Sequence, residues 1–139
     1  MSIESSSEYL FLYGTLMRGL GAMDSLAAAS CLQFLRKAQV RGQLYDLGSY
    51  PGLLSGQGQV CGEVYEVLDP QIWSILDPYE DYFPGNEKGS LYVREQLELC
   101  DGSGWVWTYI YNNKVDERSL IADGDWRRYW FEKRQNMGV

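Results

Sequence analysis

Tyr9-Leu10-Phe11-Leu12-Tyr13-Gly14-Thr15-Leu16 is the stretch that decides the fold of this 139-residue chain. The apolar and aromatic run over residues 9–13 is typical of a strand buried on both faces of a sheet. Gly14 then breaks the strand, and a glycine here lets backbone N–H groups turn outward and approach a bound carboxylate or a developing oxyanion. By itself such a pattern more often marks only a strand ending. On this pattern residues 13–16 are a candidate binding loop.

The sequence around this strand predicts a sheet with a few helices. Alternating or β-branched and aromatic residues predict strands at 40–47, 59–68, 91–99 and 105–111, the last two joined as a hairpin through residues 101–104. Alanine- and leucine-rich residues 22–35 predict one or two short helical segments, and aromatic and basic residues interleaved over 125–135 predict a closing helix. Residues 83–90 carry only turn chemistry and are expected to form a mobile loop that acts as a lid.

The length and composition predict one soluble globular domain. With 45% hydrophobic residues, the chain has enough apolar side chain for one core and too little length for two ordinary domains. Polar residues 1–8 are expected to be a disordered tail, and residues 9–139 a single domain. An aromatic share of 14% favours strands and the walls of a small-molecule pocket.

The strongest helix signal leads to Glu80. Asp69 is a capping residue, Pro70 suits the first helical position, and the apolar residues that follow have helical spacing, so the helix ends at or just before Glu80. A carboxylate there lies at the negative end of the helix dipole, between Asp77 and Asp81. The dipole, the like charges and burial among aromatic neighbours all raise the pKa of a carboxylate, which a general base near neutrality requires. On pattern alone, a solvated acidic helix end is the commoner explanation.

Other charged residues have simpler explanations. Glu63, Glu66, Glu95 and Glu98 are expected at outward positions of alternating strands. The basic residues of the closing helix are expected on its solvated side. These are Arg127, Arg128, Lys133 and Arg134.

The composition excludes several classes of chemistry. The chain has no histidine, which removes Ser-His-Asp and Cys-His machinery and the usual imidazole metal ligands, so catalysis must use carboxylates, Tyr, Lys or Cys. A net charge of -7 argues against a nucleic-acid partner. Three widely spaced cysteines indicate neither a zinc site nor a disulfide framework. Without a leader or a membrane-length apolar run, no membrane partner is expected and a cytoplasmic location is the default.

Several short motifs, taken in order, resemble the γ-glutamylcyclotransferase superfamily, in particular the branch of γ-glutamylamine cyclotransferase and AIG2-like proteins. The resemblance covers residues 9–111. The motifs are Tyr13-Gly14-Thr15-Leu16, Gly42-Gln43-Leu44-Tyr45-Asp46-Leu47-Gly48 leading to Tyr50-Pro51-Gly52, Gly62-Glu63-Val64-Tyr65, Leu76-Asp77-Pro78-Tyr79-Glu80, and Tyr92-Val93-Arg94.

The resemblance implies an α+β fold with a small mixed β-barrel flanked by helices, and a cofactor-independent enzyme without a metal, of the carbon-nitrogen lyase or acyltransferase type. Its partner would be a small-molecule γ-glutamyl substrate, converted to 5-oxoproline and a free amine. Carried over, Tyr13, Gly14, Thr15 and Leu16 bind the γ-glutamyl group through the backbone, and Glu80 is the general acid/base. Tyr92 and Arg94 match a Tyr-x-Arg pattern, of which Tyr92 is the expected pocket residue.

Two departures leave the substrate open. Many relatives carry a polar residue soon after the loop, where this chain reads Met17-Arg18-Gly19, and a glycine-containing stretch after Glu80, where it reads Asp81-Tyr82-Phe83. One alternative is a non-catalytic binding module for a γ-glutamyl or amino-acid-like ligand. Another is a cyclotransferase for a γ-glutamyl group on an antibiotic intermediate or a protein lysine. The sequence leaves the acceptor amine and the oligomeric state undetermined.

Overall fold

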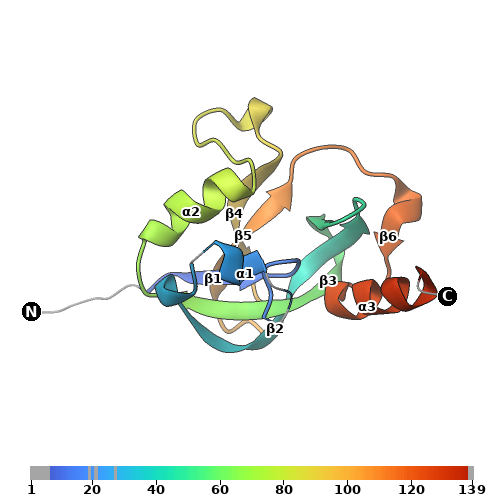
Figure 1. Ribbon diagram of the computed structural model, residues 1–139, viewed down its shortest axis with the longest axis horizontal. Coiled ribbons are helices and arrows are strands. Elements are labelled where there is room, and N and C mark those ends of the chain that lie inside the picture. Colours follow the sequence, from blue (N-terminus) through green and yellow to red (C-terminus); the bar gives the residue numbers. More distant parts are fainter. Residues whose placement is uncertain (1–6, 19, 21, 27, 138–139) are drawn as a thin grey trace, which may run out of the picture.

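The fold is a curled mixed sheet with two main helices, and the computed structural model describes residues 7–18, 20, 22–26 and 28–137 (Figure 1). The first six residues of the expected tail lie outside these ranges. The strands are β1 (Tyr9–Leu12), β2 (Leu32–Asp46), β3 (Pro51–Val67), β4 (Tyr92–Glu98), β5 (Trp105–Tyr111) and β6 (Leu120–Ile121). The helices are α1 (Ala22–Ser25), α2 (Gln71–Tyr79) and α3 (Trp126–Met137), with single 3-10 turns at Ala29–Cys31, Glu87–Gly89 and Glu117–Ser119.

The sheet has the order β4-β5-β1-β3-β2-β6. β1 lies at its centre, parallel to β5 and antiparallel to β3, which makes the sheet mixed as predicted. An isolated bridge between Val40 and Leu99 connects β2 to the residue after β4. Among the described residues, this isolated bridge occupies the position at which a full ladder of hydrogen bonds would close a barrel. The sheet is therefore curled without being a continuous barrel. The predicted α+β fold is confirmed.

β1 is the buried strand that its sequence predicts. Leu10 and Phe11 are fully buried, and Leu12 is nearly so. The central position of β1 explains this burial, because neighbouring strands cover both of its edges and side chains from both faces enter the core. From α2, Ile72 and Leu76 add to the same core, which places the end of that helix next to β1.

The helical prediction for residues 22–35 is wrong at its C-terminal end. Helical structure is confined to α1 and the turn at Ala29–Cys31, and β2 begins at Leu32. Leu32 pairs with Val67 of β3, and the two strands continue as a long bent hairpin to their other ends. Pairing with β3 gives this segment its backbone hydrogen bonds, and this tertiary context outweighs the helix propensity of its leucines.

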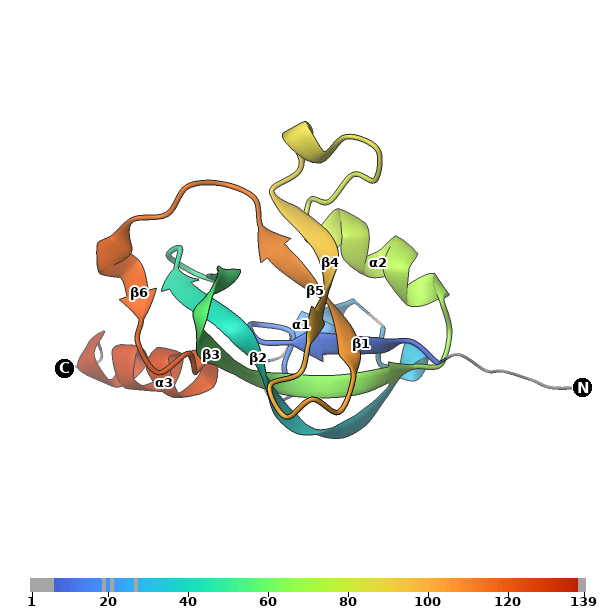
Figure 2. The same cartoon turned by 180° about the vertical axis from the view of Figure 1, so that it is seen from behind.

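The two main helices lie at separate ends of the molecule with the sheet between them (Figure 2). α3 confirms the predicted closing helix, and its Trp126 is buried in the core. None of the helices in the described ranges is long and apolar enough to cross a membrane.

Candidate active site

The site residues expected from the sequence surround one cavity of about 390 Å³. Its walls come from β1 and the loop after it, from the first residues around β3, and from the C-terminal end of α2. Residues of β4 and β5 complete it. Tyr13, Gly14, Thr15, Leu16, Glu80 and Tyr92 all line this cavity. Arg94 is not among the lining residues, because its side chain forms an ion pair with Asp77 at 3.1 Å.

A larger hollow of about 640 Å³ lies elsewhere, beside Glu63 and Arg127. Its buried carboxylate, Glu63, is already paired with Arg127, and Arg36 is paired with Asp101. The smaller cavity differs in this respect. The Glu80 carboxylate makes no hydrogen bond or ion pair with any residue in the described part of the chain. We therefore take the smaller cavity as the candidate active site.

The end of α2 presents Glu80 to the cavity. Asp69 caps the first turn, since its Oδ1 accepts the N–H of Gln71 at 2.9 Å. At the other end, Asp81 N–H donates to the Pro78 carbonyl and Tyr82 N–H to the Asp77 carbonyl, at 3.1 and 2.8 Å. This is a Schellman ending, and it turns the chain sharply just after Glu80.

Asp81 is the left-handed residue of this ending, with φ of 55°. Glycine is the usual residue there, because a side chain in this conformation costs roughly 1 kcal/mol. The aspartate in this chain therefore replaces the residue that the backbone favours.

Burial raises the pKa of Glu80 to about 7, and the charge of Asp81 adds to the effect. The upward direction of this pKa shift agrees with the expectation from the sequence. The expectation that Asp77 acts as a like charge on Glu80 was wrong, however. The Asp77 carboxylate is bound by Arg94 and accepts the Tyr109 hydroxyl at 2.6 Å. Glu80 therefore lies at the midpoint of its titration near neutrality, as an acid/base group requires.

The loop after β1 approaches Pro51 closely. A Cβ atom on Gly14 would lie 2.8 Å from Cγ of Pro51, so the glycine is needed for this close approach. Between described residues, the N–H groups of Thr15 and Leu16 donate no hydrogen bond, while that of Met17 is bound to the Gly14 carbonyl at 3.0 Å. The wall of the cavity thus holds two backbone donors suited to an anionic group.

The tyrosine hydroxyls of the cavity are engaged by the protein itself. Tyr13 donates to the Tyr109 carbonyl at 2.6 Å and accepts the N–H of Leu53 at 3.3 Å. Tyr92 donates to the Pro51 carbonyl at 2.7 Å. Burial, and then the neighbouring charges, raise the pKa of both phenols above the ordinary value. Both tyrosines therefore stay neutral and shape the walls of the cavity.

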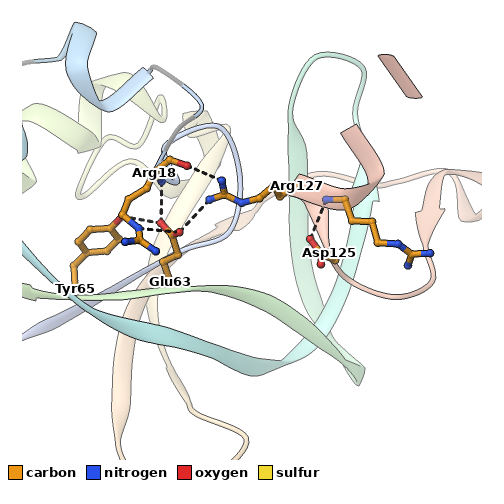
Figure 3. A network of polar contacts seen from close by, with 6 residues as sticks. Arg18, Glu63, Tyr65, Asp125 and Arg127 are labelled. Atoms are coloured by element: carbon orange, nitrogen blue, oxygen red, sulfur yellow. Dashed lines mark hydrogen bonds and ion pairs between the residues drawn. The ribbon is translucent and has the colours of Figure 1, made fainter. Parts of the chain in front are cut away.

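Glu63 is a buried neighbour of the candidate site that the sequence analysis placed wrongly. It was expected on the outward face of its strand, yet its side chain is 2% exposed. Figure 3 shows its carboxylate between Arg18 and Arg127, with the Tyr65 hydroxyl donating to it at 2.7 Å. The N–H of Arg18 donates to Oε1 at 2.9 Å, and Arg127 donates to Oε2 at 3.0 Å. Glu63 therefore fixes the chain just after the candidate binding loop.

The closing helix also anchors the turn that carries the far wall of the cavity. Tyr129 and Lys133 both donate to Oδ2 of Asp46, at 2.5 and 2.9 Å. Oδ1 of the same carboxylate accepts the N–H of Gly48 at 2.7 Å. The following residues, Ser49 and Tyr50, line the cavity. The prediction that the basic residues of the closing helix lie on its solvated side is therefore wrong for Lys133, as it is for Arg127.

The loop at residues 83–90 does not line the cavity, so the expected lid is not found in this structure. Its Ser90 hydroxyl accepts the N–H of Phe83 and donates to the Asn86 carbonyl, at 2.8 and 2.9 Å. Asn112 donates to the carbonyls of Glu87 and Ser90 from outside the loop. These bonds hold the loop to the end of β5.

The fold and the cavity together define a small α+β domain in which one titrating carboxylate faces a glycine-containing backbone loop. The profile of the family described as "Gamma-glutamyl cyclotransferase, AIG2-like" matches residues 10–128 of the chain. The chain belongs to this family, as the resemblance in its sequence implied.

Individual relatives agree with this family. The chain is 36% identical over 123 residues to "Gamma-L-glutamyl-butirosin B gamma-glutamyl cyclotransferase" of Niallia circulans, covering 86% of this chain and 76% of the relative. It is 35% identical over 118 residues to "Gamma-glutamylcyclotransferase family protein YtfP" of Escherichia coli strain K12, covering 84% and 94%. An AIG2-like protein of Mus musculus has a crystal structure that matches with a TM-score of 0.70 and 25% identity, covering 88% of this chain and 89% of that one.

Proposed function

We propose that this protein converts a γ-glutamyl amine or peptide to 5-oxoproline and a free amine, with Glu80 as the general acid/base. The observation that carries the proposal is the Glu80 carboxylate, which has no protein partner among the described residues and titrates near neutrality in the same cavity as the backbone donors of Thr15 and Leu16. No nucleophile from the protein is required, because the substrate supplies its own α-amino group.

The proposed reaction balances without water. The α-nitrogen attacks the γ-carbonyl carbon, a five-membered lactam forms, and the bond from that carbon to the leaving nitrogen breaks. Two protons leave the α-ammonium nitrogen and two reach the leaving amine. Glu80 accepts them and passes them on, so that its carboxylate is ionised again at the end of the cycle. The N–H groups of Thr15 and Leu16 would bind the substrate carboxylate or the developing oxyanion.

The names of the relatives support a γ-glutamyl amide as substrate. The Niallia circulans protein is named for a γ-glutamyl group attached to butirosin B. In this chain the cavity is open at one side, where Tyr50 and Tyr79 are 40% and 42% exposed. A γ-glutamyl group attached to a larger amine would therefore extend through this opening.

The first test is 5-oxoproline release from a panel of γ-glutamyl amines and γ-glutamyl dipeptides. Release from at least one of them is expected. The matched control is the same substrate acetylated on its α-nitrogen, which retains the amide bond but cannot cyclise, and from which no product is expected. Tight binding of the panel without release would instead support the non-catalytic binding module.

The pH dependence gives a second prediction. Since Glu80 must be ionised to accept a proton and its pKa is about 7, kcat/KM should fall about tenfold for each pH unit below 7. As the pH rises above 7 the carboxylate becomes fully ionised, so this limb should level off near pH 8. Rates measured between pH 5 and 9 at constant ionic strength would show it. A profile that is flat between pH 5 and 7 would exclude Glu80 as the base.

A further inference from the structure

The charge of the cavity is entirely negative. Glu80 and Asp81 are the only charged residues in its lining, and the described part of the chain contributes no lysine or arginine to it. The remaining lining residues are apolar, hydroxyl-bearing or aromatic. Of the nearby cations, Arg94 is held by both carboxylate oxygens of Asp77, at 3.1 and 3.2 Å, outside the cavity.

The lining residues lie at different depths in the cavity, and this difference determines how a substrate would be oriented. Glu80 is half-buried and so lies deeper than the exposed residues of the cavity, and its pKa is raised chiefly by burial. Asp81, Tyr50 and Tyr79 are exposed and lie at the rim. A γ-glutamyl group whose reacting carbonyl is beside Glu80 and whose carboxylate faces the loop after β1 must direct its leaving amine toward this rim. The rim therefore contacts the part of the substrate that differs from one γ-glutamyl compound to another.

Apart from its effect on the pKa of Glu80, the charge of Asp81 has no structural role among the described residues. Its carboxylate makes no hydrogen bond or ion pair with any other described residue, whereas its backbone N–H and carbonyl are both bound. It also has a positive φ, where glycine would be less strained. A carboxylate without a protein partner, in the lining of the same cavity as the exposed rings of Tyr50 and Tyr79, indicates a ligand that contacts it.

We propose, resting on the proposed function, that the preferred leaving amine carries a second positive charge, as polyamines and amino sugars do. Asp81 would pair with that charge, and the rings of Tyr50 and Tyr79 would contact it through their faces. A leaving amine that carries a carboxylate, such as an amino acid, would be repelled by Asp81 and by ionised Glu80. Charge at the rim thus selects the substrate, independently of the chemistry at Glu80.

Three substrates of matched length test this inference. They are the γ-glutamyl amides of 1,4-diaminobutane, n-butylamine and 4-aminobutanoate, whose free ends are cationic, neutral and anionic. We expect kcat/KM to be about tenfold higher for the cationic than for the neutral amide, and lower again for the anionic one. The ratio of cationic to neutral should shrink as ionic strength rises, because the rim is exposed to solvent.

Asp81→Asn is the decisive variant, because asparagine tolerates the left-handed conformation and differs mainly in charge. The ratio of cationic to neutral kcat/KM should fall to about threefold or less, while Glu95→Gln, on the exposed face of β4, should keep the wild-type ratio. Any effect of Asp81 on the pKa of Glu80 changes kcat/KM equally for both amides, so it cancels in their ratio. Turnover of the neutral amide as fast as the cationic one would overturn this inference and leave the proposed function intact. Absence of 5-oxoproline from all three amides would also overturn this inference, and absence from the wider panel of amines and dipeptides as well would overturn the proposed function.

Discussion

Replacing Glu80 with glutamine is expected to lower kcat/KM for 5-oxoproline release by roughly a hundredfold to ten-thousandfold. The amide has nearly the same shape as the carboxylate, and Glu80 makes no side-chain hydrogen bond to the described protein that the change would break. It cannot, however, accept a proton from the α-ammonium group. The loss should therefore appear in kcat with little change in substrate affinity, as measured by single-turnover release of 5-oxoproline.

The same variant should be more stable than the wild type at high pH. Burial raises the folded-state pKa of Glu80 from 4.5 to about 7, so the folded protein holds this proton more tightly than the unfolded chain does. The wild type accordingly loses stability as pH rises from 4.5 to 7, on the order of 3 kcal/mol, and Glu80→Gln lacks this loss.

Denaturant unfolding at pH 8 and pH 4.5 separates the two effects. Glu80→Gln should be more stable than the wild type at pH 8, equally stable at pH 4.5, and inactive. That combination would show that the ionised Glu80 carboxylate is needed for activity and destabilises the folded protein. The matched control is Glu95→Gln, whose side chain is exposed and should change neither quantity. An active Glu80→Gln enzyme would contradict the proposed mechanism.

The parts of the site that could be predicted from sequence are those that local structure determines. The apolar run of β1 ends at Gly14, and the apolar spacing of α2 ends at Glu80, so each segment places its own residue correctly. Both patterns depend on neighbours within a few positions in the chain. The family motifs then related the two segments to one another, and the cavity contains both.

Glu63 could not be placed in this way. Alternation along β3 predicts only that Glu63 faces away from Val60 and Val64, and such a face is usually solvated. Its burial comes from Arg18 and Arg127, which lie 45 and 64 positions away in the sequence and cover the carboxylate. No local pattern encodes this contact.

The same limit explains Asp77 and Lys133. Both have neighbours of the same sign in sequence, and both were therefore assigned to a group of like charges. In the fold each is paired with a residue of opposite sign from a distant strand, Asp77 with Arg94 and Lys133 with Asp46. Pairings of this kind depend on the order of strands in the sheet, which the sequence alone does not determine.

Gly124→Ala is expected to destabilise the protein by about 4 kcal/mol, the largest stability effect we predict for a single methyl group. Gly124 has φ of 65°, and a Cβ atom there would lie 2.0 Å from the carbonyl oxygen of Gln59. Its own carbonyl accepts the N–H of Cys61 at 2.8 Å, so the turn is bonded to β3 and cannot move away freely. The clash must be relieved by separating the start of α3 from β3.

Gly102→Ala is the matched control, because Gly102 also has a positive φ, of 76°, but no atom lies within 4 Å of the added methyl group. This variant should cost only the left-handed penalty of about 1 kcal/mol. The midpoint of thermal unfolding should then differ between the two variants by roughly 10 °C. Equal losses would mean that the backbone clash at Gln59 is relieved without cost. Because Arg127 follows Gly124 and holds the chain after the binding loop, the folded fraction of Gly124→Ala should also show weaker substrate binding, which Gly102→Ala should not.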